Sequence, residues 1–228
     1  MEPMGSRVDP RLIPKRPNFA IERKLWKAGI EFIAGLDEAG RGALAGPVFA
    51  AAAVFASDGK AFRQLKGVRD SKELSASERE HWRAKVAQKS LAHAVGQASA
   101  EEIDQWGIIF ATRLAMQRAL EQISVKLEHL LVDALVLPEN PLPQTTLLKG
   151  DQRSFSIAAA SILAKTARDE AMFELAAAHP GYGLARHKGY GTLEHRRKLA
   201  ELGPCALHRQ SFDWRDPSLE EGKLVEAA

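Results

Sequence analysis

Short apolar runs bounded by turn-forming or charged residues mark the candidate strands of this chain. Runs of this length are typical of strands rather than helices. One of them is continuously apolar except for Asp133, a pattern that suits a strand covered on both faces. A Pro-rich loop separates that run from a last, shorter one. The predicted strands are Glu31–Leu36, Pro47–Phe55, Leu91–Gln97, Leu130–Val136 and Thr145–Leu148.

Helical periodicity and capping residues predict the helices. Asn18 can cap a short amphipathic helix whose Ile21, Leu25 and Trp26 face inward. A Ser-x-x-Glu capping box opens a second helix. The last helix stops at a Gly-Pro pair, a common helix end. After the first, the predicted helices are Ser75–Ser90, Ile108–Ile123, Ile157–Ala178 and Thr192–Leu202.

The order of these elements predicts an α/β fold. Strands come first and then alternate with helices, which is typical of a mixed sheet flanked by helices. The helices that follow the last strand are expected to end in a small C-terminal helical cap. We therefore predict one domain over residues 18–212, with a flexible lead at 1–17 and a tail at 213–228.

Two adjacent carboxylates, Asp37 and Glu38, follow the first predicted strand and begin a Gly-rich loop that ends at Gly46. Neighbours in an extended chain point to opposite faces, but a turn at a strand end can bring both toward one site. A buried carboxylate is costly without a cation, and Mg²⁺ prefers carboxylate oxygens. An exposed strand-to-turn junction explains this pair equally well, so both interpretations stay open at this point.

Two further acids favour a metal site. Asp133 interrupts an apolar run, where an unpaired buried charge would cost several kcal/mol, unless it lies past the strand end in solvent. Asp151 follows a short strand and a glycine. Acids at the ends of separate strands could converge on two cations, and metals about 4 Å apart stabilise both oxygens of a phosphodiester displacement. Asp169 is the rival for the fourth position; it lies four residues after Lys165, the spacing of a helix ion pair, and we rank Asp151 above it.

Composition narrows the class of protein. The chain is 45% hydrophobic and 27% charged, as in ordinary soluble domains. No apolar run approaches the roughly 20 residues of a membrane span, and the first residues carry charges and prolines where a secretory signal is apolar. A single cysteine, Cys205, cannot form an internal disulfide, and no Cys/His cluster suggests zinc. We expect a cytoplasmic protein with no membrane partner.

The distribution of charge says more than its sum. The formal net charge is only +3, which is weak evidence for a nucleic-acid partner. Residues 186–198 (RHKGYGTLEHRRK) are strongly basic and include Tyr190. Such a segment is either a solvated face or a phosphate contact.

Seven motifs, in order along the chain, resemble those of type 2 ribonucleases H, the ribonuclease HII family. Each motif alone is weakly specific, but the ordered set is very specific and covers about residues 31–212. The motifs are Gly35–Val48 (GLDEAGRGALAGPV), Asp70–Ser75, Leu131–Asp133, Lys149–Asp151, Ser156–Asp169, His187–Thr192 and His208–Phe212.

The resemblance implies a ribonuclease H-like fold and hydrolysis of the RNA strand of RNA/DNA hybrids. It also implies cuts at ribonucleotides embedded in duplex DNA, leaving 5′-phosphate and 3′-hydroxyl ends. The metal-binding acids of the family correspond to Asp37, Glu38, Asp133 and Asp151. The implied cofactor is Mg²⁺ or Mn²⁺, and the implied partners are RNA/DNA hybrid and ribonucleotide-containing duplex DNA.

The resemblance also implies residues that read the substrate. Glycines expose backbone groups, and the 2′-hydroxyl is the group that distinguishes RNA from DNA. A core ring is the alternative for the tyrosine, and a turn before a helix cap explains the Ser-Lys pair equally well. This sequence has Ala43 where the family often has proline and Ala134 where glycine is common. The implied substrate residues are Gly40, Arg41, Gly42, Ser71, Lys72, Lys165 and Tyr190.

The sequence therefore predicts a metal-dependent endonuclease. A related metal nuclease that acts on DNA junctions is the runner-up. A hybrid-binding protein that has lost catalysis is the alternative from another class, and the presence of all four acids disfavours it.

Overall fold

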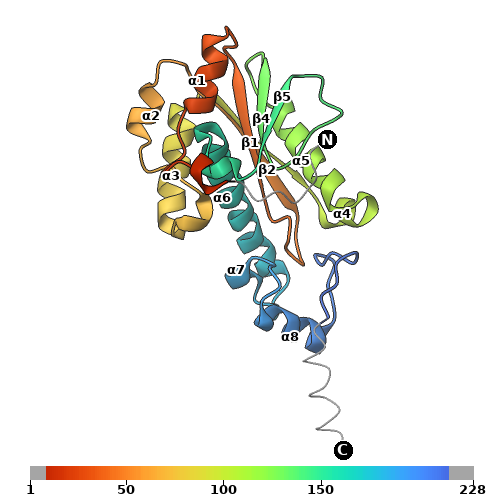
Figure 1. The fold of residues 1–228 in the computed structure, drawn as a ribbon. Helices are drawn as coiled ribbons and strands as arrows, with labels where there is room; N and C mark the ends of the chain where they lie inside the picture. Colours follow the sequence, from red (N-terminus) through yellow and green to blue (C-terminus); the bar gives the residue numbers. More distant parts are fainter. Residues whose placement is uncertain (1–8, 216–228) are drawn as a thin grey trace, which may run out of the picture.

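The computed structural model describes residues 9–215, which form a five-stranded sheet with helices on both faces (Figure 1). The strand order is β3-β2-β1-β4-β5. Three strands are antiparallel neighbours, whereas β4 runs parallel to β1 and β5 runs parallel to β4. The predicted mixed α/β sheet is confirmed. The strands are β1 (Ile33–Ala39), β2 (Val48–Val54), β3 (Ala92–Ala98), β4 (His129–Asp133) and β5 (Gln144–Leu147).

The apolar pattern of β2 explains why both faces of the sheet are covered. Every residue of this strand is buried. Alternate side chains point to opposite faces, so Ala50 and Ala52 pack toward α5 (Ile108–Glu121) while Ala51 and Ala53 pack toward α6 (Phe155–Ala178). Small side chains let the helices approach closely, which brings α6 against the strands that carry the acids.

Most predicted helices are present within a residue or two of their predicted ends, as expected for helix boundaries. Ser75 and Glu78 form the predicted capping box, and Thr192 caps the last helix. The short helices α2, α4 and α7 were not predicted, although Ser99 and Glu102 form a second capping box at the start of α4. The remaining helices are α1 (Ala20–Lys27), α2 (Lys60–Gln64), α3 (Ala76–Lys89), α4 (Ala100–Trp106), α7 (Leu184–His187) and α8 (Leu193–Leu202).

Two predicted strand ends are wrong in a way that matters for the site. β1 continues through Ala39, so Asp37 and Glu38 lie inside the strand and not in the following loop. β4 ends at Asp133 instead of Val136, because Ala134 has a φ of 51°. That left-handed conformation ends the extended chain immediately after the acid.

The predicted C-terminal helical cap is confirmed, and it packs on the loop after β1. Figure 1 shows α7 and α8 beyond the end of α6 that lies farthest from α1. Leu44 and Ala45 of the loop form an apolar cluster with Leu184 and Leu199 of the cap. An isolated bridge joins Ala45 to His208. The cap therefore fixes the segment that follows the two acids of β1.

The ends of the chain lie only partly within the described structure. Of the predicted lead, residues 9–17 are described: Pro10–Leu12 form a 3-10 helix, and Arg16 donates a hydrogen bond to the Lys66 carbonyl. Residues 1–8 and 216–228, with most of the predicted tail, lie outside the described residues. None of the helices in the described part is both long enough and apolar enough to cross a membrane.

Candidate active site

The four predicted acids lie within or just after the C-terminal parts of the three strands β1, β4 and β5. The parallel register pairs Leu36 with Val132, so Asp37 and Asp133 are the next residues of adjacent strands. Glu38 follows Asp37 in β1, and Asp151 lies in the 3-10 turn Gly150–Gln152 that follows β5. The fold thus brings acids from widely separated parts of the sequence, residues 37 and 38, 133 and 151, to neighbouring strands and the turn after β5.

Hydrogen bonds and ion pairs orient these carboxylates. The backbone N–H of Gly150 donates to Asp133 Oδ1 at 2.6 Å, which ties the turn after β5 to the end of β4. Arg41 lies 3.2 Å from Glu38 Oε1. Lys72, on the turn before α3, places its Nζ 3.6 Å from an Asp151 oxygen.

Burial and mutual repulsion disfavour the charged forms of these acids. Burial raises the pKa of Asp37 well above its usual value, and the nearby charges of Glu38, Asp133 and Asp151 raise it further. Burial raises the pKa of Asp133 to about 6. Burial, and then repulsion by Asp70, raises the pKa of Asp151 to about 6. Such a cluster is stabilised by cations that balance its charge.

The donor set fits a hard divalent cation. All four side chains offer carboxylate oxygens, which Mg²⁺ and Mn²⁺ prefer. Glu38 Oε2 is buried and accepts no hydrogen bond from the described residues, so it has a free lone pair for a ligand. Within residues 9–215, no three Asp, Glu, His or Cys side chains stand close enough to hold a metal ion as they are. Metal binding would therefore require these carboxylates to turn toward a shared ion.

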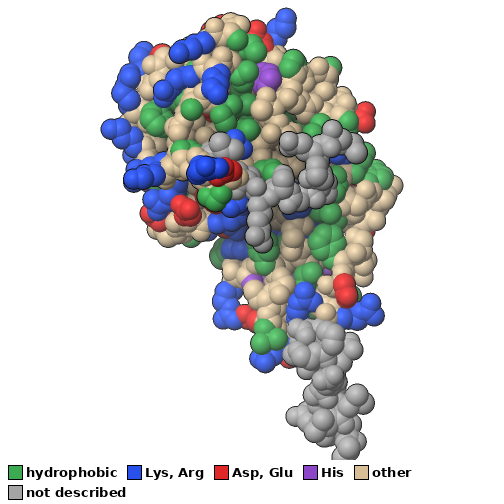
Figure 2. Space-filling view, in the orientation of Figure 1, with side chains coloured by type: hydrophobic (Ala, Val, Ile, Leu, Met, Phe, Trp, Pro, Cys, Tyr) green, Lys and Arg blue, Asp and Glu red, His purple; other side chains and the backbone are tan. Residues whose placement is uncertain are grey.

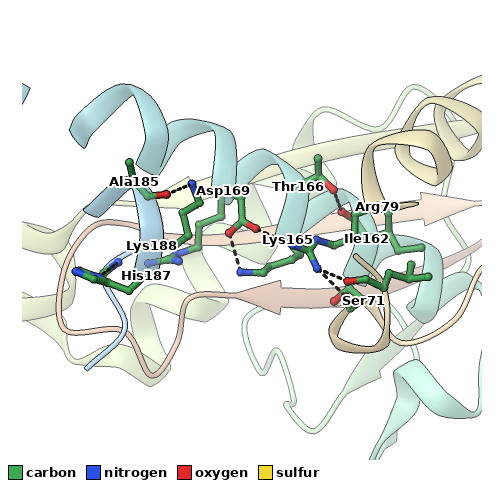
Figure 3. A network of polar contacts seen from close by, with 12 residues as sticks. Ser71, Arg79, Ile162, Lys165, Thr166, Asp169, Ala185, His187 and Lys188 are labelled. Atoms are coloured by element: carbon green, nitrogen blue, oxygen red, sulfur yellow. Dashed lines mark hydrogen bonds and ion pairs between the residues drawn. The ribbon is translucent and has the colours of Figure 1, made fainter. Parts of the chain in front are cut away.

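Asp169, the rival fourth acid, has a different environment. Figure 3 shows its carboxylate between Lys165 and Arg79. Its oxygens lie 2.7 Å from the lysine Nζ and 3.3 Å from the arginine. The predicted helix ion pair is confirmed, and two cations already balance the charge of Asp169. This supports Asp151 over Asp169 as the fourth acid.

The predicted Gly-Arg-Gly segment and Tyr190 are joined by the backbone. The N–H groups of Leu44 and Ala45 donate to the Gly189 carbonyl at 2.8 and 3.3 Å, and Ala43 forms a bridge with Tyr190. The loop that follows the acids of β1 therefore lies beside the glycine turn of the basic segment.

The two glycines of this segment differ in what the protein requires of them. Gly40 has a φ of 90°, and a Cβ there would lie 1.8 Å from Arg168 Nε. Gly42 has no left-handed φ, and a Cβ there would meet no described atom within 4 Å. Neither backbone conformation nor packing in the described protein therefore requires a glycine at position 42. The exposed backbone of this residue borders open space.

The other predicted substrate residues lie around this loop but are not equally accessible. The Tyr190 ring is half-buried, with the Lys165 Nζ 5.3 Å and the Arg168 guanidinium 5.2 Å from its centroid. Lys72 is 79% exposed at its side chain. Ser71, in contrast, is buried, and its hydroxyl lies 2.8 Å from that of Ser161.

Sequence reasoning gave no role to three histidines that support the Tyr190 turn. His195 Nε2 lies 3.0 Å from His208 Nε2, and its Nδ1 lies 3.0 Å from the Tyr190 carbonyl. The His187 ring stacks on that of His195 at 4.3 Å. Arg168 and Arg209 were missed as well, although both lie inside motifs already quoted. Their position within those motifs was the available signal.

Basic side chains gather on two parts of the face that Figure 2 shows. Figure 2 shows Lys and Arg side chains along the side of the molecule formed by α1 to α3, and again on the cap. A surface of this kind suits a phosphate backbone.

The five-stranded mixed sheet with helices on both faces is the architecture of the ribonuclease H-like class of proteins, and it matches the crystal structure of the ribonuclease H2 from Pyrococcus horikoshii OT3 with a TM-score of 0.67 at 25% identity, over 84% of this chain and 98% of that one. A profile of the ribonuclease HII family matches residues 34–214, and the chain belongs to that family. It is accordingly an endoribonuclease of the ribonuclease H type, and the predicted resemblance is confirmed.

Individual relatives agree with this assignment. Ribonuclease HII of Synechococcus sp. (strain JA-3-3Ab) is 51% identical over 86% of this chain and 88% of its own length. Ribonuclease HII of Moorella thermoacetica is 49% identical over 85% of this chain and 92% of its own. Among solved structures, the PCNA:RNase HII complex from Archaeoglobus fulgidus matches with a TM-score of 0.68 at 27% identity, over 83% of this chain and 99% of that one.

Proposed function

We propose that this enzyme cuts the RNA strand of RNA/DNA hybrids and also cuts at single ribonucleotides embedded in duplex DNA. The products would carry 5′-phosphate and 3′-hydroxyl ends. Asp37, Glu38, Asp133 and Asp151 would hold Mg²⁺ or Mn²⁺.

The observation that carries this proposal is the continuity between the acids and the Gly-Arg-Gly loop. Glu38 and Gly40 are two residues apart, and Arg41 pairs with Glu38. Backbone hydrogen bonds hold Tyr190 against the same loop. A group that reads the ribose and the acids that direct the cut would therefore share one frame, which fixes the distance between recognition and cleavage.

The chain's own residues have distinct parts in this scheme. Bound divalent ions would polarise the attacking water and stabilise the departing 3′ oxygen. Lys72, exposed beside Asp151, is positioned to contact a phosphate. The phosphate contact proposed for Ser71 would use its backbone N–H, because its hydroxyl is bound to Ser161. Lys165 would contribute less than a free lysine, since it pairs with Asp169.

Tyr190 is proposed to recognise the ribose. Its phenol can exchange a hydrogen bond with a 2′-hydroxyl, and its ring can pack on the neighbouring sugar. Losing one neutral hydrogen bond costs about 1 kcal/mol, or several-fold in rate. Losing the ring also removes positioning, which can cost about 10²-fold. On a single-ribonucleotide duplex we expect wild type to be fastest, Tyr190→Phe intermediate and Tyr190→Ala slowest.

Mn²⁺ affinity serves as the control for this series and should be the same in all three proteins. A tyrosine with a purely structural role predicts another pattern, in which Tyr190→Ala unfolds readily and Tyr190→Phe cleaves normally. Wild-type rates for Tyr190→Phe on both hybrid and single-ribonucleotide substrates would show that its hydroxyl does not read the ribose.

A further inference from the structure

Two arginines are fully buried beneath the Gly-Arg-Gly loop. Arg168 of α6 and Arg209, after the cap, both have 0% exposure. Burial lowers the pKa of both groups, to about 9 for Arg209. A buried charge is costly, and neither guanidinium forms an ion pair with a carboxylate in the described part of the chain. Packing alone does not explain why the fold buries two charged groups at this free-energy cost.

The side-chain hydrogen bonds that Arg209 donates go to backbone carbonyls of this one loop. Its Nη2 donates to the Gly40 carbonyl at 2.8 Å, and its Nη1 donates to the Arg41 carbonyl at 3.0 Å. Its Nε donates to the Gly46 carbonyl at 3.0 Å. One planar fork thus fixes two successive peptide units and the far end of the loop.

Peptide geometry converts this anchoring into a direction for the N–H groups. The described chain has no cis peptide bonds, and in a planar trans peptide the C=O and the following N–H point in opposite directions. A Gly40 carbonyl turned inward therefore turns the Arg41 N–H outward, and the Arg41 carbonyl does the same for the Gly42 N–H. Neither N–H has an acceptor among the described residues.

We propose that Arg209 is a positioning residue for substrate specificity: its buried guanidinium aims the N–H groups of Arg41 and Gly42 at the ribose 2′-oxygen. Successive outward N–H groups form a concavity that suits an oxygen acceptor. The open space beside Gly42 lets that oxygen approach. This inference rests on the proposed recognition of single ribonucleotides.

The test measures the affinity for duplex DNA with one ribonucleotide relative to the affinity for the same all-DNA duplex. The measurement uses Asp133→Asn protein, so that the substrate stays intact. Arg209→Met replaces the guanidinium by an uncharged side chain of similar size. Arg209→Lys keeps the positive charge, but a single ammonium group cannot reach all three carbonyls. Arg118→Met is the matched control, because Arg118 also donates to a backbone carbonyl, that of Gln97, but on another part of the sheet.

We expect Arg209→Met to reduce the affinity ratio about 10-fold, the equivalent of one to two neutral hydrogen bonds. Arg209→Lys should also show most of this reduction in the affinity ratio, whereas Arg118→Met should have the same ratio as the parent protein. An unchanged ratio in Arg209→Met would overturn the inference; if that variant does not fold, an unchanged ratio in Arg209→Lys would overturn it.

Gly42→Ala distinguishes this failure from failure of the proposed function. The added methyl meets no described atom, so the protein should fold as stably as wild type while cleaving the single-ribonucleotide duplex at least about 10-fold more slowly. Two results would refute substrate reading by this loop and, with it, the role of Arg209. One is cleavage by Gly42→Ala at the wild-type rate, and the other is equal affinity of the parent protein for the two duplexes. Slow Gly42→Ala with an unchanged ratio in Arg209→Met would refute the role of Arg209 alone.

Discussion

Ala134 shows how one residue ends a strand at a functional acid. It adopts a φ of 51°, a conformation that costs a residue with a Cβ roughly 1–2 kcal/mol. Its N–H donates to the Leu147 carbonyl at 3.1 Å, which holds the turn beside β5. The resemblance already identified this position as one where glycine is common, and the backbone conformation gives the physical reason.

Ala134→Gly should therefore stabilise the protein. Relief of the left-handed strain exceeds the roughly 0.4–1 kcal/mol by which glycine favours the unfolded chain. We expect a net gain of about 0.5 kcal/mol, or about 1–2 °C in melting temperature. Ala84→Gly, at an exposed position inside α3, is the matched control and should lose about 1 kcal/mol. A lower melting temperature for Ala134→Gly would contradict the strain at this residue.

Asp151 and Asp169 should respond differently to loss of charge. Asp151 is repelled by Asp70 and Asp133, so Asp151→Asn should keep or raise the melting temperature without divalent metal while abolishing cleavage. Asp169 is mostly buried and is paired with Lys165 and Arg79, so Asp169→Asn should lose about 1 kcal/mol or more of stability and retain cleavage. Thermal unfolding and cleavage rates of both variants would check this. The reverse pattern would make Asp169 the metal ligand.

Local signals predicted the elements, but long-range contacts set their ends. The Ser75 capping box and the apolar runs lie in neighbouring residues, and these local patterns placed the strands and the longer helices correctly. The extension of β1 through Ala39 was not visible, because pairing with β2 supplies the hydrogen bonds for those residues. Glu22 was also missed: it is fully buried in α1, where it accepts hydrogen bonds from Ser154 and Ser156 at the start of α6. Nothing local distinguishes such a glutamate from a solvent-exposed one.

The histidines around α8 should make the cap sensitive to acid. Burial, and then the nearby His187, lowers the pKa of His195 from 6.5 to about 4. Between these pH values the His195 imidazole binds a proton in the unfolded chain but stays neutral in the folded protein. Stability is therefore lost as the pH falls from about 6.5 toward 4. Asp133 and Asp151, with raised pKa values, oppose this trend, since their contribution falls as the pH rises through about 6.

His195→Asn isolates the histidine contribution, because wild type and variant share the acids. On going from pH 7.5 to pH 5, wild type should lose on the order of 1 kcal/mol more unfolding free energy than the variant. Urea unfolding at the two pH values measures it. Equal acid sensitivity in both proteins would mean that His195 does not titrate in this way.

At the scale of the whole molecule, the site is assembled from segments that are distant in sequence. β1 supplies two acids and the loop that follows them, β4 and the turn after β5 supply the others, and the cap brings Tyr190 to that loop. Sequence motifs identified these residues individually, whereas their arrangement depends on the sheet order. The motifs singled out the positions of the two buried arginines, but their burial could not be predicted from the sequence, because arginine is usually exposed and only the fold reveals its burial.

The central claim is that four carboxylates direct cleavage at ribonucleotides, and the initial rate on duplex DNA with one ribonucleotide tests it most directly. With Mg²⁺, wild type should cut this duplex and leave an all-DNA duplex intact, and EDTA should stop the reaction. Asp37→Asn, Glu38→Gln, Asp133→Asn and Asp151→Asn should each slow it by about 10²-fold or more, while binding to hybrid persists through basic groups. Near-normal cleavage by Asp133→Asn, or equal cleavage of the all-DNA duplex, would contradict the account.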